Sequence, residues 1–419
     1  MSGGLLQLVA YGVEDLLITG DPQITLFKTS FKRYTNFTKK QHTFSNSSLQ
    51  FGQRTTFHLN AGDLVEDIWL EITFPRLNTP NTVYAWKSFP ACTLIQWIEV
   101  RIDDIVAYKM TGEWIFLHQN LYGKSEKRKG WNQMVGHVSE MINFTSPKEA
   151  FTCNLRIPFW NEISSGIPLA SLSGQNVYLD IKLQPIQNIL FQGEWNASNS
   201  SYDITNPNAN SFSKIRLNLS MHLDTIYLDD FEKQQFQTKD HSTWYKSISV
   251  DEYHSDLTTI ETNIVFTNPL VELLWTFESS KTIQPYNYCD TLDTINNSGA
   301  TVDAYPSFIY GGSSSVCRRA ELILNDVVRV SKRGGAYFNK CQPLQHHTGI
   351  YPGVQLYSFA LSPEVDLPSG HCPSNTLVLK QELDFFNGDL DNTSYTLKIY
   401  KITLNRLNFS NGICSTLYS

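Results

Sequence analysis

Residues 57–75 read FHLNAGDLVEDIWLEITFP, and residues 264–280 read IVFTNPLVELLWTFESS, a similar pattern much later in the chain. Apolar and polar residues alternate in parts of both stretches, which is the two-residue period of a β-strand with one buried face. Similar segments far apart in one chain indicate an internal duplication. The two stretches therefore predict that the chain contains one β-rich unit twice.

Two further pairs of segments keep the same order in the two halves. WIEVRIDDIVAYKMTGEW (97–114) resembles RAELILNDVVRVSKRGGAY (319–337). LRIPFWNEISSGIPLASLSGQNVYLDIKL (155–183) resembles VQLYSFALSPEVDLPSGHCPSNTLVLKQEL (354–383). The three pairs are separated by similar but unequal numbers of residues, which places insertions in loops, where chains tolerate them. Three ordered pairs predict two complete copies of one domain.

Short runs typical of strands recur between turn signals in each half, and strong helical periodicity is nearly absent. About eight strands per copy fit a jelly roll, in which two sheets bury a shared core. The predicted fold class is therefore all-β: two tandem eight-stranded antiparallel jelly rolls, a double jelly roll, with long loops and little helix. Helix is predicted only locally, at 111–121 and 229–236.

Turns and loops complete this organisation. Asp103-Asp104 and Asn325-Asp326 separate β runs, and Asn and Asp favour the tight turns of hairpins. Long loops are predicted at 115–150, 185–213 and 281–316, which makes those segments candidate interaction surfaces.

The duplication sets the expected domain boundaries. We expect an N-terminal arm at 1–27, a first jelly roll at 28–223, a linker at 224–245, and a second jelly roll with a C-terminal tail at 246–419. The arm precedes the first repeated unit, and nothing in the second copy corresponds to it. Its apolar residues still need burial, which favours docking on a neighbouring subunit or an inner layer over an edge strand of the first domain.

Composition excludes several classes of function. The 419 residues can bury a large core without disulfides or metals. The net charge of −7 argues against direct coating of nucleic acid, which requires a basic face. The short basic run KSEKRK (124–129) is interpreted as a solvated loop.

Seven scattered cysteines predict free thiols made in a reducing compartment. No apolar run reaches membrane-span length, and the first residues lack the basic region of a signal peptide. Synthesis and folding in the cytosol are therefore expected.

Motifs for catalysis or metal binding are weak. Gly123-Lys124-Ser125 resembles the end of a P-loop, but His118 stands where the earlier glycine is required. His346-His347 is interpreted as a loop or a satisfied surface pair, because adjacent histidines on a strand point to opposite faces. Asp103-Asp104 and Asp229-Asp230 fit turns better than paired glycosidase carboxylates. The sequence therefore predicts no catalytic, cofactor-binding or metal-binding residues, no cofactor, and no enzymatic activity.

The N-terminal residues carry a specific resemblance. GGLLQLVAYGVEDLLITGDPQITLFKTSFKRYTNF (3–37) contains QLVAYG, then TGDPQITLFK, then a basic, aromatic segment ending in TNF. A second signature comprises KRGGAYFNKCQPLQHH (332–347) and GVQLYSFALSPEVDLPSGHCPSNT (353–376). Together they resemble the major capsid proteins of nucleocytoplasmic large DNA viruses, such as chlorovirus and iridovirus coats. Glu14 and Leu17 depart from the family pattern, which affects the assignment to a subfamily.

The resemblance implies a structural coat protein. Three chains would form a homotrimeric capsomer whose six lobes fit a hexagonal lattice, in the icosahedral shell of a large double-stranded DNA virus. Its partners would be neighbouring capsomers and minor capsid proteins under the shell, close to an internal viral membrane. The protein would be located in the virion capsid and assembled in the host cytoplasm. Alternative readings are a lower-copy minor capsid paralogue with the same fold, a carbohydrate-binding jelly-roll module, and a jelly-roll enzyme.

Some relatives carry unusual glycans on outer loops, and this chain is rich in N-x-S/T sequons. By that resemblance, Asn196, Asn199 and Asn296 are the candidate glycosylation positions, since all three lie in predicted long loops.

Overall fold

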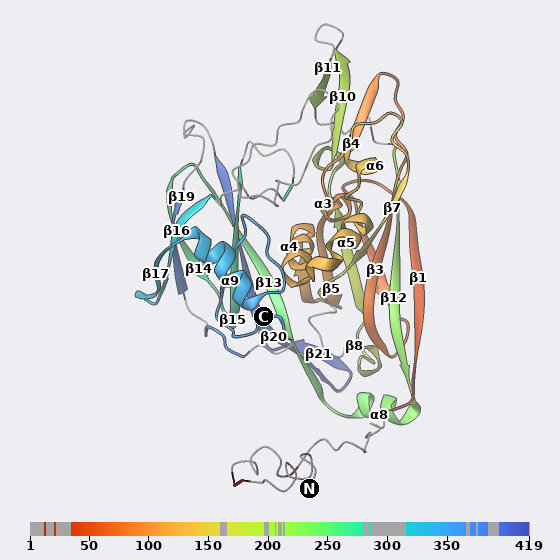
Figure 1. The fold of residues 1–419 in the computed structure, drawn as a ribbon. Helices are drawn as coiled ribbons and strands as arrows, with labels where there is room; N and C mark the ends of the chain where they lie inside the picture. Colours follow the sequence, from red (N-terminus) through yellow and green to blue (C-terminus); the bar gives the residue numbers. More distant parts are fainter. Residues whose placement is uncertain are drawn as a thin grey trace, which may run out of the picture. The chain divides into compact units, whose positions relative to one another are not determined.

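Strands dominate the chain from Phe37 onward (Figure 1). The computed structural model describes residues 12–13, 21, 35–159, 166–196, 201–205, 207, 212, 214–279, 285–286, 288, 316–365, 369–373, 376–383 and 394–418. Residues 1–36 and 37–419 are separate compact units, and both rolls lie in the second unit.

The strands of the first jelly roll lie between Phe37 and Leu228. They are β1 (Phe37–Leu49), β2 (Arg54–Leu59), β3 (Leu64–Phe74), β4 (Thr82–Trp86), β5 (Ile95–Ile102), β6 (Ile105–Met110), β7 (Phe151–Arg156), β8 (Ile167–Pro168), β9 (Val177–Leu183), β10 (Leu190–Asn196), β11 (Ser201–Thr205) and β12 (Leu217–Leu228).

The strands of the second jelly roll lie between His241 and Thr416. They are β13 (His241–Ser255), β14 (Thr259–Val265), β15 (Leu270–Ser279), β16 (Cys317–Leu324), β17 (Val327–Gly334), β18 (Gln355–Ser358), β19 (Thr376–Leu383), β20 (Tyr395–Ser410) and β21 (Ile413–Thr416).

The two rolls repeat one sheet topology. One sheet of the first roll has the order β1-β12-β3-β7, and its counterpart has the order β13-β20-β15-β18. A second sheet has the order β2-β9-β5-β6 in the first roll and β14-β19-β16-β17 in the second roll, and the first roll has an additional small sheet with the order β11-β10-β4. Every pair of these strands is antiparallel. The predicted double jelly roll is confirmed, and the three repeated segments correspond to equivalent strands.

The predicted hairpin turns are confirmed. Asp103-Asp104 joins β5 to β6, and Asn325-Asp326 joins β16 to β17. Asp103, Asn325 and Asp326 have φ angles of 46°, 48° and 63°, the left-handed region that Asn and Asp enter at lower cost than most residues.

Helices occupy the connections. They are α3 (Pro90–Leu94), α4 (Gly112–Tyr122), η1 (Ser125–Lys127), α5 (Arg128–Met134), α6 (Ser139–Ile142), η2 (Leu169–Ser171), η3 (Ile186–Asn188), α8 (Asp230–Thr238), η5 (Tyr337–Cys341) and α9 (Gln342–His346). The local helices predicted at 111–121 and 229–236 correspond to α4 and α8 and are confirmed. Strand β12 extends to Leu228 and β13 begins at His241, so both strands enter the segment 224–245 that was expected to be a linker.

The prediction of a long loop is wrong for two of the three segments. Residues 115–150 contain most of α4 together with η1, α5 and α6. The sequence of helix α5, RKGWNQM, shows no apolar period, and none of its residues is buried. A hydrogen bond from Ala91 N to Val135 O (3.1 Å) connects its C-terminal end to α3. Residues 185–213 contain the hairpin β10–β11, which pairs with β4. Most of the third predicted loop, 281–316, lies outside the described residues.

A register difference distinguishes the two rolls. LVEDIW (64–69) and LVELLW (270–275) align Trp69 with Trp275 in sequence. The β-bulge lies at Glu66 in β3 but at Val271 in β15, one position earlier in the motif. Because side chains alternate between faces, this shift turns the two tryptophans to opposite sides. Trp275 is buried in the core of the second roll, whereas Trp69 is only partly buried on the outer side of its sheet.

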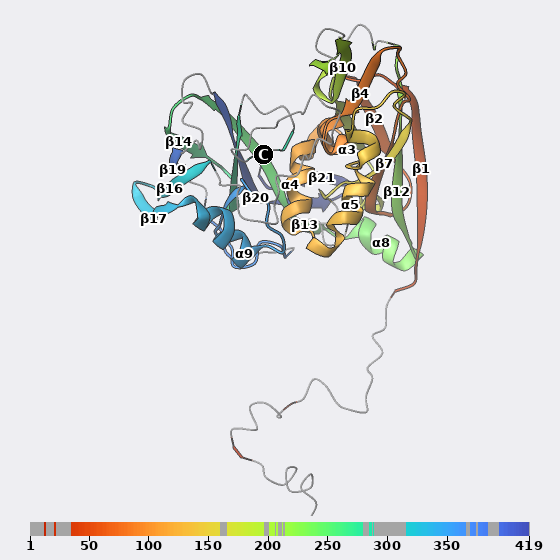
Figure 2. The ribbon, with the colours of Figure 1, turned by 45° about the horizontal axis from the view of Figure 1, so that its top comes forward.

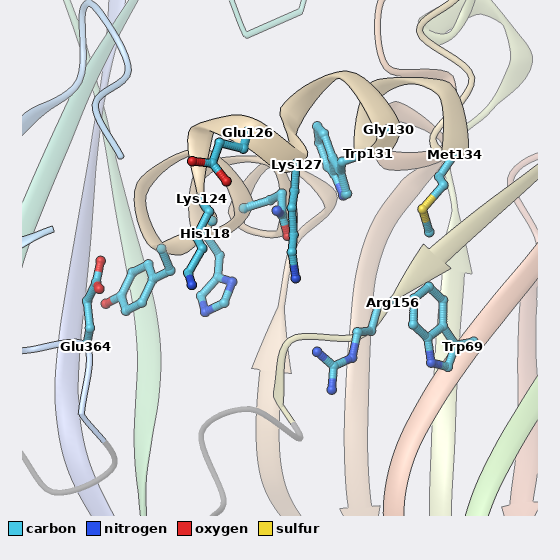
Figure 3. Close-up of a pocket in the computed structure, with 13 residues that line it drawn as sticks. Trp69, His118, Lys124, Glu126, Lys127, Gly130, Trp131, Met134, Arg156 and Glu364 are labelled. Carbon is cyan, nitrogen blue, oxygen red and sulfur yellow. The ribbon is translucent and has the colours of Figure 1, made fainter. Parts of the chain in front are cut away.

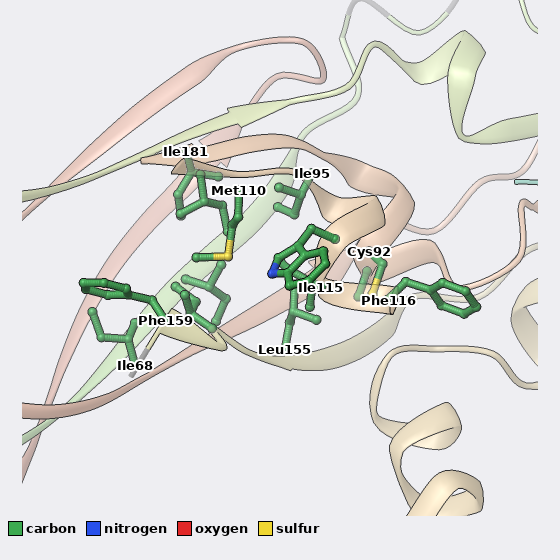
Figure 4. Packing of buried hydrophobic residues seen from close by; sticks show 14 of the residues in the cluster. Ile68, Cys92, Ile95, Met110, Ile115, Phe116, Leu155, Phe159 and Ile181 are labelled. Carbon is green, nitrogen blue, oxygen red and sulfur yellow. The ribbon is translucent and has the colours of Figure 1, made fainter. Parts of the chain in front are cut away.

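Apolar residues form two cores. The larger core fills the first roll, and Figure 4 shows part of its packing around Met110, Ile115 and Leu155. This same cluster includes Val271, Leu274, Tyr400 and Ile402 from the second roll. The smaller cluster lies inside the second roll. Apolar packing therefore continues from the first roll onto the outside of the second.

Candidate functional site

Helix α4 lies between the two rolls (Figures 1 and 2). Thr111 caps its first turn by accepting a hydrogen bond from Trp114 N (3.1 Å). Gly112 allows close approach, because a Cβ atom there would collide with the carbonyl oxygen of Cys92. The buried indole of Trp114 lies 5.8 Å from the ring of Tyr400 on β20. Helix α4 thus covers the outer side of the β13-β20-β15-β18 sheet, which we call the second-roll outer face.

An ionic network crosses this junction. Lys398 Nζ on β20 lies 2.7 Å from Glu113 Oε2 of α4 and 2.9 Å from Glu278 Oε2 of β15. Tyr288 also donates to Glu113 Oε1 (2.7 Å). Burial opposes the charge on Lys398, but attraction to the two carboxylates outweighs it and raises the pKa of this ammonium group. One cation thus links the two rolls.

A histidine forms a second buried link. His347 Nε2 lies 3.0 Å from Glu272 Oε1 on β15, and its Nδ1 lies 3.3 Å from Glu364 Oε1. Tyr122 of α4 donates to the other oxygen of Glu272 (3.0 Å). Burial lowers the pKa of His347, but the charge of Glu272 and the bonds to both carboxylates reverse this and raise it to about 9. The imidazolium is therefore charged at neutral pH and bridges two acids.

Direct contacts between strands extend the junction. Tyr245 on β13 donates to the carbonyl oxygen of Ala107 on β6 (2.7 Å). Lys246 Nζ lies over the ring of Tyr122, 5.5 Å from its centroid. These contacts join side chains of the second roll to β6 and α4 of the first roll. The arrangement is suited to fixing the relative orientation of the two rolls.

A groove lies between the α4–α5 segment, Glu364 of the second roll and the outer side of the β1-β12-β3-β7 sheet. We call this side of the sheet the first-roll outer face. A cavity of about 670 Å³ shares Trp69 and Met134 with a smaller one of about 300 Å³. Figure 3 shows Lys124, Lys127 and Arg156 reaching into the larger cavity. Arg156 lies over the ring of Trp69 and pairs with Asp67 (2.6 Å). The other residues that line the two cavities are Gln41, His118, Gln119, Tyr122, Gly123, Glu126, Gly130, Trp131, Asn154, His222 and Glu364.

The predicted glycosylation positions are only partly described. Asn196 is the last residue of β10 and is opposite Ser201 in the β10–β11 hairpin, but its side chain lies outside the described residues. Asn199 and Asn296 lie entirely outside them. The structure therefore brings none of the three side chains into a described site.

The acidic pairs act in turns and caps. Asp103 accepts a hydrogen bond from Asn176 N (3.0 Å) at the β5–β6 turn, and Asp229 caps α8 by accepting from Glu232 N (2.8 Å). The turn interpretation is confirmed for Asp103-Asp104, whereas Asp229 and Asp230 begin helix α8. Lys124 follows the end of α4 and lines the groove, without the strand–loop–helix arrangement of a P-loop. The surface interpretation of the histidine pair is wrong for His347, which is buried in the junction, while His346 ends α9.

The junction residues were missed by sequence reasoning. A signal existed in β15, where Glu272 interrupts the apolar run LVELLWTF. A carboxylate within a buried strand requires a partner. Its partners His347 and Tyr122 lie far away in sequence, so only the folded chain identifies them.

The cysteines in the described part of the chain are mostly buried. None of the described cysteines Cys92, Cys153, Cys317, Cys341, Cys372 and Cys414 forms a disulfide with another described residue, and of these six only Cys341 is exposed. In the same part of the chain, no three His, Cys, Asp or Glu side chains gather in an arrangement that could hold a metal ion. None of the helices within those ranges is long and apolar enough to cross a membrane.

Comparisons with known proteins agree with this architecture. Residues 25–229 match the family described as major capsid protein N-terminus, and residues 200–414 match the large eukaryotic DNA virus major capsid protein family. The chain is 31% identical to the major capsid protein of Paramecium bursaria Chlorella virus 1, over 89% of this chain and 84% of that protein. It is 26% identical to the major capsid protein of Phaeocystis pouchetii virus over the full length of both.

Solved structures show the same fold. A quasi-atomic model of the PBCV-1 virus capsid superposes with a TM-score of 0.73 at 23% identity, covering 94% of this chain and 100% of that one. The Faustovirus major capsid protein gives a TM-score of 0.70 at 10% identity, covering 96% and 94%. With two family matches that together span most of the sequence, the chain belongs to the large eukaryotic DNA virus major capsid protein family.

Proposed function

We propose that this structural protein of the virion capsid assembles as a homotrimer, and that the trimer is a pseudo-hexagonal capsomer of the icosahedral shell. The observation that supports this is the pair of rolls that share the strand order of their two main sheets and are joined by the packing of α4 on the second roll. Three such chains present six similar lobes. Six lobes fit a hexagonal lattice, and a threefold rotation closes the ring.

Light scattering tests the proposal. The purified chain should be a trimer at micromolar concentration, and its mass should not change on moderate dilution. A stable monomer under these conditions would contradict the proposed assembly.

The proposal extends to partners. The capsomer contacts neighbouring capsomers and minor capsid proteins beneath the shell, near an internal viral membrane, after assembly in the host cytoplasm. It catalyses no reaction. It does not coat nucleic acid directly, and the net charge of −7 supports this second point. Cross-linking mass spectrometry on intact virions should recover links to other capsid proteins and none to packaged DNA.

We also propose domain boundaries and glycan positions for the chain. The outline is an arm at 1–27, rolls at 28–223 and 246–419, and a connection at 224–245. Asn196, Asn199 and Asn296 are the proposed glycan positions. Glycopeptide mass spectrometry of virions should find modified peptides at these asparagines, and unmodified peptides at all three would exclude them.

A further inference from the structure

We infer that adjacent capsomers bind each other by pairing the first roll of one chain with the second roll of another chain, through the outer sides of two sheets. We call the outer side of the β2-β9-β5-β6 sheet the first lateral face, and the outer side of the β14-β19-β16-β17 sheet the second lateral face. The inference rests on the proposed function, because it names the surfaces through which one trimer contacts the next trimer in the shell.

Both lateral faces are open. Alternate residues of β2 and of β14 are exposed, and the residues between them are buried in the rolls. In the second roll, α4 covers the outer side of the other sheet. Figure 1 shows the second lateral face on the side of that roll away from α4. Because the two rolls repeat one topology, we place the first lateral face at the equivalent position in the ring.

The alternation of lobes determines which faces meet. The six lobes of the proposed trimer alternate between first and second rolls, so two opposite lobes are always of different kinds. In an array of capsomers that share one orientation, each contact joins opposite lobes of two trimers. A first roll therefore contacts a second roll.

The same geometry sets the order of strands across the contact. The long strands of both rolls run between the same two ends of the molecule (Figure 1), so the sheets and not the strand ends face sideways. Opposite lobes are related by a half-turn about the threefold axis, which reverses the strand order. Strand β6 then lies opposite β14, β5 opposite β19, and β9 opposite β16.

Strand pairing aligns the two lateral faces. In the first roll, Glu99 of β5 is opposite Lys109 of β6. In the second roll, Glu321 of β16 is opposite Lys380 of β19, which in turn is opposite Glu261 of β14. The internal repeat aligns Glu99 with Glu321. All five residues therefore lie at one level along the strands.

An ion pair lies at this level on each face. Lys109 Nζ is 2.6 Å from Glu99 Oε1, and Lys380 Nζ is 3.1 Å from Glu261 Oε2. With the strand order reversed, Lys109 meets Glu261, and Glu99 meets Lys380. The two pairs then form a square of alternating charge. Exposed pairs contribute little stability by themselves, but complementary charges across a contact select the partner and fix the register.

The third position at this level is also complementary. Asp180 of β9 is fully buried, because Arg54 Nη2 (2.8 Å) and Arg101 Nε (3.1 Å) bind its carboxylate from the solvent side. The first lateral face therefore presents two guanidinium groups where β9 meets β16. The residue of β16 at this level is Glu321, which has the opposite charge.

Apolar side chains cross the second lateral face at the next level. Val378 of β19 is opposite Ile323 of β16, which is opposite Val328 of β17. Val328 is 51% exposed, and the other two are partly exposed. A row of partly exposed aliphatic residues on three neighbouring strands provides an apolar contact surface.

An aromatic row lies at the same level of the first lateral face. Tyr178 of β9 is stacked on His58 of β2, with ring centroids 5.0 Å apart, and the guanidinium of Arg101 lies 4.9 Å from the centroid of the Tyr178 ring. Tyr and Arg are enriched in the cores of protein interfaces. The aromatic row of one face and the aliphatic row of the other are therefore suited to pack together beside the square of charges.

Carbodiimide cross-linking of intact virions provides the deciding experiment, because this reagent joins amines only to carboxylates in direct contact. Mass spectrometry should find the crosswise links Lys109–Glu261 and Lys380–Glu99. The links Lys109–Glu99 and Lys380–Glu261 form within each face and serve as internal positive controls. Virions dissociated to trimers before treatment should lose the crosswise links and keep the links within each face.

Charge reversal measures the contribution of the square. Lys109→Glu and Glu261→Lys should each raise the trimer concentration needed for lattice formation, whereas the double variant should restore assembly. The control is Lys239→Glu, an exposed position after α8 and outside both lateral faces, which should assemble like the wild type.

A variant in the aliphatic row tests the second level. Val378→Lys places an ammonium group opposite Arg101 and should raise the trimer concentration needed for lattice formation about tenfold or more. The mass of the trimer and its thermal unfolding should not change, because this side chain points away from the core. The control is Val378→Thr, a neutral residue of similar shape, which should assemble like the wild type.

The outcomes separate this inference from the proposed function. A monomeric wild-type protein would overturn both. Virions that give the links within each face but no crosswise links would overturn this contact and leave the trimer standing. Crosswise links that persist in dissociated trimers would also overturn it, because the two faces would then meet inside one capsomer. Crosswise links found only in intact virions support the inference.

Discussion

The outer faces of the two rolls share one strand order but differ in their side chains. The second-roll outer face carries Leu274 and Tyr400, which pack against Trp114. The first-roll outer face carries Trp69 and His222 at the matched positions, where a groove lies open. A duplicated fold therefore supplies the same surface twice, and side chains determine whether it is covered within the chain or left for a partner.

The largest expected effect on stability comes from Trp114 on the covered face, in contrast to Trp69 on the first-roll outer face. Trp114→Ala should lower the free energy of unfolding by about 3–5 kcal/mol, because it leaves a large cavity in a packed junction. Trp69→Ala removes a partly buried ring and should cost about 1 kcal/mol or less in the monomer. Urea unfolding of both variants under conditions that keep the protein monomeric checks the difference. Equal losses would show that the first-roll outer face is as tightly packed as the second.

The ionic link should make the junction sensitive to pH. Binding to Glu272 and Glu364 raises the pKa of His347 from an ordinary value of 6.5 to about 9. Its contribution to stability is fully present below pH 6.5 and is lost as the pH rises through 9. Relative to His347→Gln, the wild type should therefore lose a few kcal/mol across this window. Urea unfolding of the two proteins at matched pH values measures the change, and a constant difference would contradict a charged His347.

The hairpin turns should give a smaller contrast. Asn325→Ala should destabilise the chain by about 1 kcal/mol, because alanine resists the left-handed conformation, whereas Asn325→Gly should not. Asp103→Ala should cost more than Asn325→Ala, since its carboxylate also accepts a hydrogen bond from Asn176 N. Thermal unfolding of the three variants checks the order. A harmless Asp103→Ala would show that the two hairpins do not differ in this way.

The smallest effect is expected from the N-terminal segment. Deleting residues 1–25 should leave thermal unfolding within a few degrees of the intact protein while weakening lattice formation. Within the described residues, the strands of both rolls lie at Phe37 or later, and the first family match begins at residue 25. Calorimetry and lattice assembly assays measure the two properties. If the deletion unfolds the isolated protein, the segment belongs to the first roll.

Local sequence patterns were sufficient to predict much of the architecture. Alternating residues in Val177–Leu183 predict a half-buried strand, and the acidic turn residues predict the two hairpins. These features depend on nearest neighbours along the chain, so the sequence reveals them. The repetition of three such segments in order was enough to predict two rolls of one topology, and the N-terminal signature indicated the family.

Tertiary structure decided which faces are covered. The sequence aligns Trp69 with Trp275, but a bulge displaced by one residue turns them to opposite sides. Helix α5 and the β10–β11 hairpin have weak local signals and depend on partners elsewhere in the chain. The pairing of His347 with Glu272 joins residues far apart in sequence. Alternation along a strand specifies that two faces differ, but only the bulge and the packing of distant segments determine which face becomes core and which becomes a binding surface.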